Sequence, residues 1–162
     1  MYGGDNMAEE IMSNENQYVV FQLGKETYGL EISMILEIIT MQTITEVPGT
    51  EEFIEGIINL RGRVIPVFNL HKKFELVQGE ITRSTRIVVV EVEGHNIGML
   101  VDGVSEVVKI TQDVVEQPSS IMSEIDKEYL AGVAKLEDKL VILLDLVKVL
   151  QREDGVLLEN IG

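Results

Sequence analysis

The chain carries the same pattern twice, and this repeat limits the possible folds more than any other feature. Residues 18–41 match residues 87–110 when the first stretch is shifted by 69 positions. Gly29 then falls on Gly98 and Glu37 falls on Glu106, with branched apolar runs coinciding on either side. A repeat of this kind indicates a structural unit that was duplicated and packed against its copy.

The second part of each copy also matches, at a shift of 76. Residues 53–70 lie over residues 129–146, so that Gly56 meets Gly132. The change of shift from 69 to 76 implies an insertion in the second copy, within 112–128. Chance similarity between two β-rich segments is the alternative, but two glycines and two turn positions in register favour duplication.

Each copy predicts several short strands. In the first copy, hairpins are expected over 17–32 and over 57–70, the second with Arg61–Gly62 at its tip. A further strand is expected from Glu37 to Val47. Pro66 cannot donate to a sheet, so its strand is expected at an edge or a bulge.

Short helices follow the strands. Thr50 is expected to cap one helical turn, and Asn69 and Asp145 are expected to cap short helices at equivalent positions of the two copies. About five short strands per copy predict a small antiparallel barrel, which removes sheet edges by closure. The sequence therefore predicts a mainly β protein built of two packed barrels.

Composition excludes several classes of protein. The 162 residues suffice for one domain or two small ones, and a hydrophobic fraction of 45% provides a core. The formal charge of −15 repels nucleic-acid phosphates, so protein partners are expected and nucleic acid is not. Cysteine is absent, which excludes disulfides, thiolate nucleophiles and cysteine-ligated zinc.

The termini predict a cytoplasmic protein with loosely held ends. The acidic N-terminus lacks the basic and apolar regions of a secretory signal, and no apolar run reaches the length of a membrane helix. We expect a flexible segment over 1–14, a folded domain over 15–152 with halves of 15–83 and 84–152, and a tail over 153–162. Direct membrane insertion is not expected.

No catalytic arrangement is evident in the sequence. His71 and His95 are interpreted as solvated, and Asp102 as a turn residue that bonds to the backbone. The alternative from the enzyme class is a β-barrel hydrolase that uses Glu37 and Glu106 as paired carboxylates in one cleft. No metal site or cofactor is expected.

Arg61 is the residue that the fold explains least. The equivalent position of the second copy holds Glu137, so a hairpin of this kind does not need arginine at its tip. Recognition of a carboxylate by the planar guanidinium is one interpretation, with Glu37 either as a partner within the chain or as a second contact. A solvated turn residue is the other.

Several motifs, taken in order, resemble the CheW family of chemotaxis adaptors. These are YGLEI at 28–32, EI at 37–38, GIINLRG at 56–62, VDGV at 101–104 and EYLAG at 128–132. The resemblance runs from Gln17 to Leu150 and implies two five-stranded SH3-like barrels with a hydrophobic seam. It leaves open whether the copies exchange strands.

The resemblance also implies a function without catalysis. Such adaptors bridge the cytoplasmic tip of chemoreceptors and the regulatory domain of the histidine kinase CheA, at the inner face of the cell membrane. A similar adaptor of another motility or developmental pathway is the alternative. The family's loop over 111–122 can lie at a kinase contact, but it is acidic in this chain.

Six positions match the family's binding surface at the seam. For Ile35 and Val107, and likewise for Val101, buried packing is the alternative interpretation. The residues carried over as receptor- or kinase-binding are Ile35, Glu37, Gly56, Arg61, Gly98 and Val107.

Overall fold

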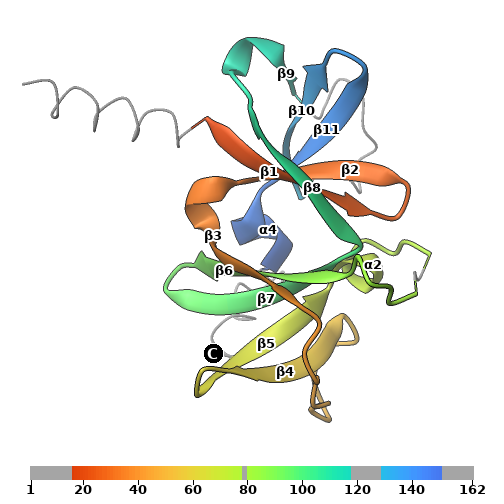
Figure 1. Ribbon diagram of the computed structural model, residues 1–162, viewed down its shortest axis with the longest axis vertical. Helices are drawn as coiled ribbons and strands as arrows, with labels where there is room; N and C mark the ends of the chain where they lie inside the picture. Colours follow the sequence, from red (N-terminus) through yellow and green to blue (C-terminus); the bar gives the residue numbers. More distant parts are fainter. Residues whose placement is uncertain (1–15, 78–79, 118–128, 151–162) are drawn as a thin grey trace, which may run out of the picture.

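The computed structural model describes residues 16–77, 80–117 and 129–150, and its strands form two sheets stacked along the long axis of the molecule (Figure 1). One sheet has six strands in the order β8-β1-β2-β11-β10-β9, and the other has five in the order β3-β6-β7-β5-β4. The mainly β architecture that the sequence predicted is confirmed.

The six-stranded sheet closes on itself. Its edge strands β8 and β9 are joined by the short helix η2 (Gln112–Val114), so the chain passes from one edge to the other. We refer to this sheet as barrel A. Its strands are β1 (Gln17–Leu23), β2 (Glu26–Glu31), β8 (Gly103–Lys109), β9 (Val115–Glu116), β10 (Leu130–Leu136) and β11 (Lys139–Leu144).

The five-stranded sheet closes in the same way. Beyond the edge strand β3, Thr45 forms two backbone hydrogen bonds of 2.9 and 2.8 Å with Ile57 of the opposite edge strand β4. We refer to this sheet as barrel B. Its strands are β3 (Ile35–Thr40), β4 (Ile54–Leu60), β5 (Arg63–Asn69), β6 (Arg86–Val92) and β7 (His95–Val101).

The duplication is visible in the bounds of the strands. A shift of 69 carries β1 onto β6, and a shift of 76 carries β4 onto β10. The two parallel pairings among the described strands are also equivalent, because β5 aligns with β7 at Gly98 and β11 aligns with β2 at Gly29. The repeat seen in the sequence is therefore a repeat of structure.

Each barrel contains strands of both copies. The hairpin β1–β2 of the first copy lies in barrel A with β8 to β11, whereas the hairpin β6–β7 of the second copy lies in barrel B with β3, β4 and β5. The exchange that the sequence left open is thus present. The domain limits at 15 and 152 and the boundary between the halves at 83 stay predictions.

Three hydrophobic clusters hold the molecule together. One fills barrel A around Val20 and Val141, and one fills barrel B around Val89 and Ile65, at positions related by the two shifts. The third and largest lies between the barrels and includes Phe21, Phe68 and buried residues of the C-terminal helix. This third cluster is the hydrophobic seam that the resemblance implied.

Two short helices extend the seam. Asn69 accepts a hydrogen bond of 3.2 Å from the backbone of Lys72 and caps α2 (Leu70–Lys73). Asp145 accepts an equivalent bond of 3.2 Å from the backbone of Lys148 and starts α4 (Leu146–Leu150), which lies between the barrels (Figure 1). Both predicted caps are confirmed, and the predicted continuation of the second helix lies outside the described residues.

Three local predictions were wrong. The strand of Pro66, β5, lies between β7 and β4 and is not an edge strand, and the register shift of the β4–β5 pair lies between Ile54 and Gly56. Thr50 does not cap a helical turn, because its hydroxyl donates to the carbonyl of Val47 and residues 52 and 53 form a turn instead. The strand expected to run from Glu37 to Val47 ends at Thr40, and only Thr45 pairs again. The chain must leave one edge of the barrel here to reach the other.

Candidate functional site

The tip of the β4–β5 hairpin carries a strained arginine. Arg61 has a φ of 53° and Gly62 a φ of 84°, which is the two-residue turn with both central residues in the left-handed region. A residue with a side chain adopts this region at a steric cost, and such positions gather at functional sites. The side chain of Asn59 supports the turn by accepting a hydrogen bond of 2.9 Å from Gly62 N–H.

Arg61 forms a bidentate ion pair with Glu37 on β3. Its Nη2 donates to Glu37 Oε1 at 2.9 Å, and its Nη1 donates to Oε2. The arginine side chain is 71% exposed and the glutamate 29%, so the guanidinium presents its outer face to solvent. Glu37 is therefore the partner of Arg61 within the chain, one of the two roles that the sequence left open.

The pair shifts the protonation of both groups. The hydrogen bond from Arg61, together with its charge, lowers the pKa of Glu37 although partial desolvation opposes this. The hydrogen bond to Glu37 raises the pKa of Arg61 in turn. Both groups are consequently charged throughout the neutral range.

The second copy has a related but different pair. Glu106, the equivalent of Glu37, accepts a hydrogen bond of 2.5 Å from Lys139 Nζ. Lys139 corresponds to Arg63 and not to Arg61, whose position holds Glu137. A carboxylate paired with a cation is thus common to both barrels, while the arginine at a left-handed tip belongs to the first copy.

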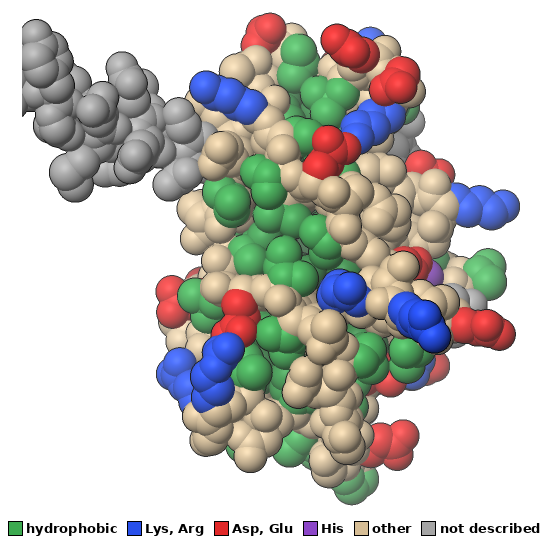
Figure 2. Space-filling view, viewed as in Figure 1, with side chains coloured by type: hydrophobic (Ala, Val, Ile, Leu, Met, Phe, Trp, Pro, Cys, Tyr) green, Lys and Arg blue, Asp and Glu red, His purple; other side chains and the backbone are tan. Residues whose placement is uncertain are grey.

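Exposed hydrophobic side chains accompany the ion pair. On β3 and β8 these are Leu36, Ile38 and Val107, which are 51%, 39% and 52% exposed. Figure 2 shows hydrophobic side chains gathered between the two barrels on the face that β3 and β8 cover, with acidic and basic side chains at its margin. We refer to Leu36, Glu37, Ile38, Arg61 and Val107 as the seam face.

Of the three apolar positions considered for the binding surface, some lie on the surface and some in the core. Val107 is exposed and belongs to the seam face, whereas Val101 is buried. Ile35 is partly buried and packs against the cluster between the barrels. Buried packing is therefore the correct interpretation for Val101, and Ile35 lies at the boundary between core and surface.

Gly56 and Gly98 are buried, and the structure gives each a packing reason. A Cβ on Gly56 would lie 2.1 Å from the carbonyl oxygen of Thr45, at the bond that closes barrel B. A Cβ on Gly98 would lie 2.8 Å from Ile87, where β5 and β7 run parallel. Neither glycine offers a side chain or an exposed surface to a partner, so any part they take in binding is indirect.

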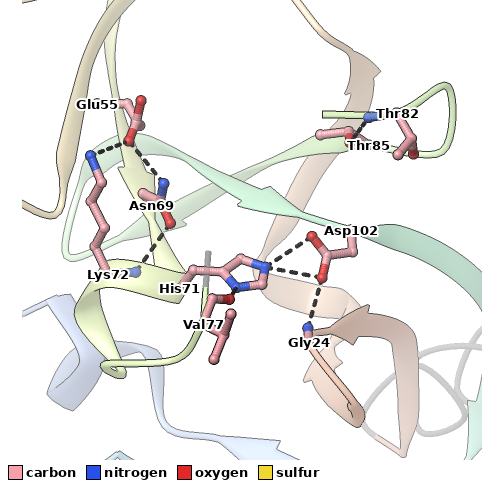
Figure 3. A network of polar contacts seen from close by, with 9 residues as sticks. All are labelled: Gly24, Glu55, Asn69, His71, Lys72, Val77, Thr82, Thr85 and Asp102. Atoms are coloured by element: carbon pink, nitrogen blue, oxygen red, sulfur yellow. Dashed lines mark hydrogen bonds and ion pairs between the residues drawn. The ribbon is translucent and has the colours of Figure 1, made fainter. Parts of the chain in front are cut away.

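Sequence reasoning missed a polar network beside α2 (Figure 3). His71, interpreted as solvated, is in fact buried, and its Nε2 lies 2.9 and 3.0 Å from the two carboxylate oxygens of Asp102. Asp102 also accepts a hydrogen bond of 2.7 Å from Gly24 N–H, which confirms its predicted bond to the backbone. The VDGV motif was the only sequence signal that pointed here.

A second part of the network surrounds Glu55. Burial disfavours its ionisation, but hydrogen bonds from Lys72 at 2.9 Å and Asn69 at 2.8 Å outweigh this and lower the pKa of Glu55. With His71 and Asp102 these side chains line a cavity of about 240 Å³. Among the described residues, no group of three or more potential ligand side chains is placed to hold a metal ion.

The two carboxylates of the hydrolase alternative lie on different barrels. Glu37 is on β3 and pairs with Arg61, and Glu106 is on β8 and pairs with Lys139. Each carboxylate is held by a cation of its own barrel, so the geometry gives the paired-carboxylate mechanism no support.

The acidic segment over 111–122 is described only in part. Asp113 accepts a hydrogen bond from the Thr111 hydroxyl, and Glu116 on β9 forms an ion pair of 2.6 Å with Lys135. Residues 118–122 lie outside the described residues. The predicted kinase contact of this segment stays a prediction.

Within the described parts of the chain, none of the helices has the length and apolar character needed to cross a membrane.

The chain is similar to known proteins over most of its length. A CheW-like domain matches residues 17–154. "Chemotaxis protein CheW" of Treponema pallidum is 32% identical over 155 residues, which is 93% of this chain and 91% of the relative. "Chemotaxis protein CheW" of Bacillus subtilis is 33% identical over 150 residues, 92% of this chain and 95% of the relative.

A solved structure shares the fold. The crystal structure of the scaffolding protein TtCheW from Thermoanaerobacter tengcongensis superposes with a TM-score of 0.79 at 39% sequence identity. The match covers 86% of this chain and 90% of that one. The two barrels, the repeat and these matches together show that the chain belongs to the CheW-like family.

Proposed function

We propose that this protein is a chemotaxis adaptor that holds the cytoplasmic tip of a chemoreceptor and the regulatory domain of the kinase CheA in one complex. Members of the CheW-like family are adaptors and scaffolds, and the chain is accordingly not an enzyme. Its proposed place is the cytoplasm, at the inner face of the membrane, where receptors recruit it.

Arg61 is the observation that carries this proposal. The chain has an arginine in a left-handed turn, whereas the equivalent hairpin tip of the second copy, Glu137–Asp138, has neither an arginine nor a left-handed residue. A side chain retained at a steric cost and left 71% exposed is best explained by recognition. The bidentate pair with Glu37 holds the guanidinium in place before a partner arrives, which lowers the entropy cost of binding.

The seam face fits an amphipathic helix. Leu36, Ile38 and Val107 supply exposed apolar contacts, and the ion pair supplies a polar rim. An apolar strip with polar margins is how proteins accept the hydrophobic face of a helix. We assign the receptor tip to this face, with Ile35 beneath it and with Gly56 and Gly98 shaping the barrel that carries it.

An adaptor must bind two partners at once. The kinase domain therefore requires a different surface, and holding both partners together raises their effective concentration. The net charge of −15 favours partners that bring basic or apolar surfaces.

Titration calorimetry tests the proposal. The protein is titrated first with the CheA regulatory domain, then with a receptor-tip fragment, and finally with each in the presence of the other. Micromolar or tighter binding to both, with formation of a ternary complex, supports the adaptor role. Absence of heat with both partners would assign the protein to a different signalling pathway.

A further inference from the structure

The His71–Asp102 pair ties together parts of the chain that are distant in sequence. His71 follows the first residue of α2 and thus the end of β5, and Asp102 directly precedes β8. Its carboxylate also holds Gly24 in the β1–β2 turn, and its backbone N–H donates to Gln22 at 2.9 Å. One carboxylate therefore connects the end of a barrel B strand to the start of one barrel A strand and to the turn of another (Figure 3).

The histidine ring is held on both of its sides. Its Nδ1 lies 2.8 Å from the carbonyl oxygen of Val77, and its Nε2 faces both oxygens of Asp102. A carbonyl and a carboxylate can only accept, so in each of these contacts the ring nitrogen is the side that can donate. The side chain of His71 is only 8% exposed, whereas that of Asp102 is 33% exposed, so the contact is buried on the histidine side. Hydrogen bonds to a carboxylate are stronger than those between neutral groups.

The fold itself does not require this pair. At the equivalent positions the second copy has Val147 after its capping residue, and the first copy has Ser33 after its second strand. Val147 packs against the hydrophobic cluster between the barrels. The other side of the molecule is thus built without an ionic pair, and the His71–Asp102 contact is a feature added to one side only.

We propose that His71 and Asp102 are positioning residues for the seam face, which they serve by fixing β8 relative to β5. The two strands carry opposite parts of this face: Val107 lies on β8, and Arg61 lies at the tip that leads into β5. Cross-linking the strands at their other ends sets the angle between the barrels and thereby the spacing of the two contacts. That the seam face binds a partner rests on the proposed function. That the His71–Asp102 pair fixes β8 relative to β5 does not.

The second copy supplies the test variants. His71→Val and Asp102→Ser install the residues that occupy the equivalent positions. Each variant should fold, and each should weaken binding of the receptor-tip fragment by about three- to tenfold, the range expected for residues that act through another element. The double variant should lose no more than Asp102→Ser alone, because His71 acts through the Asp102 carboxylate, which also holds Gly24. Additive losses would contradict a shared role, and so would unfolding of both single variants.

A measurement without any partner separates this inference from the proposed function. The chain has no cysteine, so Leu140→Cys on β11 and Glu91→Cys on β6 give two unique, exposed sites for spin labels, one in each barrel. We expect a narrow distribution of distances between the labels in the parent protein. His71→Val and Asp102→Ser should each broaden or shift this distribution. Unchanged distributions would overturn the inference even if the receptor fragment binds, and changed ones uphold it even if that fragment does not bind.

Discussion

Arg61 combines three properties that rarely occur together in one surface residue. It has a left-handed backbone, it forms a bidentate ion pair, and most of its side chain is exposed. Asn59 and Gly62 satisfy the turn without help from the arginine side chain. The guanidinium can therefore be changed without removing what shapes the hairpin.

Arg61→Glu should strongly weaken binding to the seam face and leave the fold intact. The substitution places a carboxylate next to Glu37, but the hydrogen bond from Gly62 N–H to Asn59 that shapes the turn does not involve the arginine side chain. Affinity for the receptor-tip fragment should fall at least about tenfold, as for a central contact residue. Calorimetry measures the affinity and circular dichroism the fold, with Lys25→Glu at the exposed β1–β2 turn as a charge-matched control. An unfolded variant, or one that binds normally, would count against the role of Arg61.

Glu37 should resist protonation for as long as Arg61 is present. Its pKa is lowered in the folded protein, so the stabilising pair is complete above the pH at which an unfolded glutamate titrates. The stabilisation is lost only as the pH falls further, through the lowered folded value. Carboxyl NMR titration should show the midpoint of Glu37 rising in an Arg61→Ala variant. The same midpoint in both proteins would mean that the ion pair does not persist in solution.

At the scale of single residues, the comparison of equivalent positions in the two copies was the most informative feature of the sequence. Arg61 stood out because its equivalent is Glu137. The burial of His71 was missed because its neighbours Lys72 and Lys73 suggest a solvated segment, whereas its partner Asp102 is 31 residues away. A contact between two such residues depends on how the strands pack, and no local pattern contains that information.

Among the structural elements, the closures of the barrels depend on glycine. Gly56 faces the carbonyl of Thr45 where barrel B closes, and Gly132 faces Val115 and Glu116 at the equivalent place in barrel A. The parallel pairings use Gly98 and Gly29 in the same way. The glycines that define the sequence repeat are thus the points of closest approach in the fold.

Replacing these glycines with alanine should lower the free energy of unfolding by amounts that differ from one position to the next. Gly98→Ala should cost about 1–3 kcal/mol, because the added methyl meets the rigid side chain of Ile87. Gly56→Ala should cost more, since its methyl meets a backbone oxygen at a φ of 150°. Gly62→Ala, with a left-handed φ but open space, should cost only about 1 kcal/mol. Urea unfolding measures all three, and a Gly62 variant as unstable as the Gly56 variant would refute the packing explanation.

The repeat predicted elements better than local propensity did. Strand pairs such as β4 and β10 follow from aligned apolar runs and match to the residue. The helical turn at Thr50 and the long strand from Glu37 were expected from local signals alone. Both failed because the chain here has to cross from β3 to β4, and closure of the barrel overrides local preference.

For the molecule as a whole, the exchange of hairpins makes the two copies interdependent. Barrel A needs β1 and β2 from the first copy, and barrel B needs β6 and β7 from the second. The exchange could not be read from the sequence, because either arrangement buries the same apolar strands. Pairing between distant strands is set by the complete set of contacts and not by any one segment.

Neither half should therefore fold alone. A fragment of residues 15–83 lacks β8 and β11, the strands that flank β1 and β2, and a fragment of 84–152 lacks β3 and β5, the strands that flank β6 and β7. Each fragment should give an unfolded NMR spectrum, whereas the intact protein should unfold in one cooperative transition. A half that shows dispersed amide signals by itself would contradict the interdependence.

The most direct test of the central claim is an NMR titration of the intact protein with a receptor-tip fragment, in which the amide and methyl chemical shifts are monitored. The perturbed signals should cluster on β3, on β8 and at the Arg61–Gly62 tip, with little change around Glu46 and Glu51 on the acidic side of barrel B. Perturbations centred away from the seam face would contradict it.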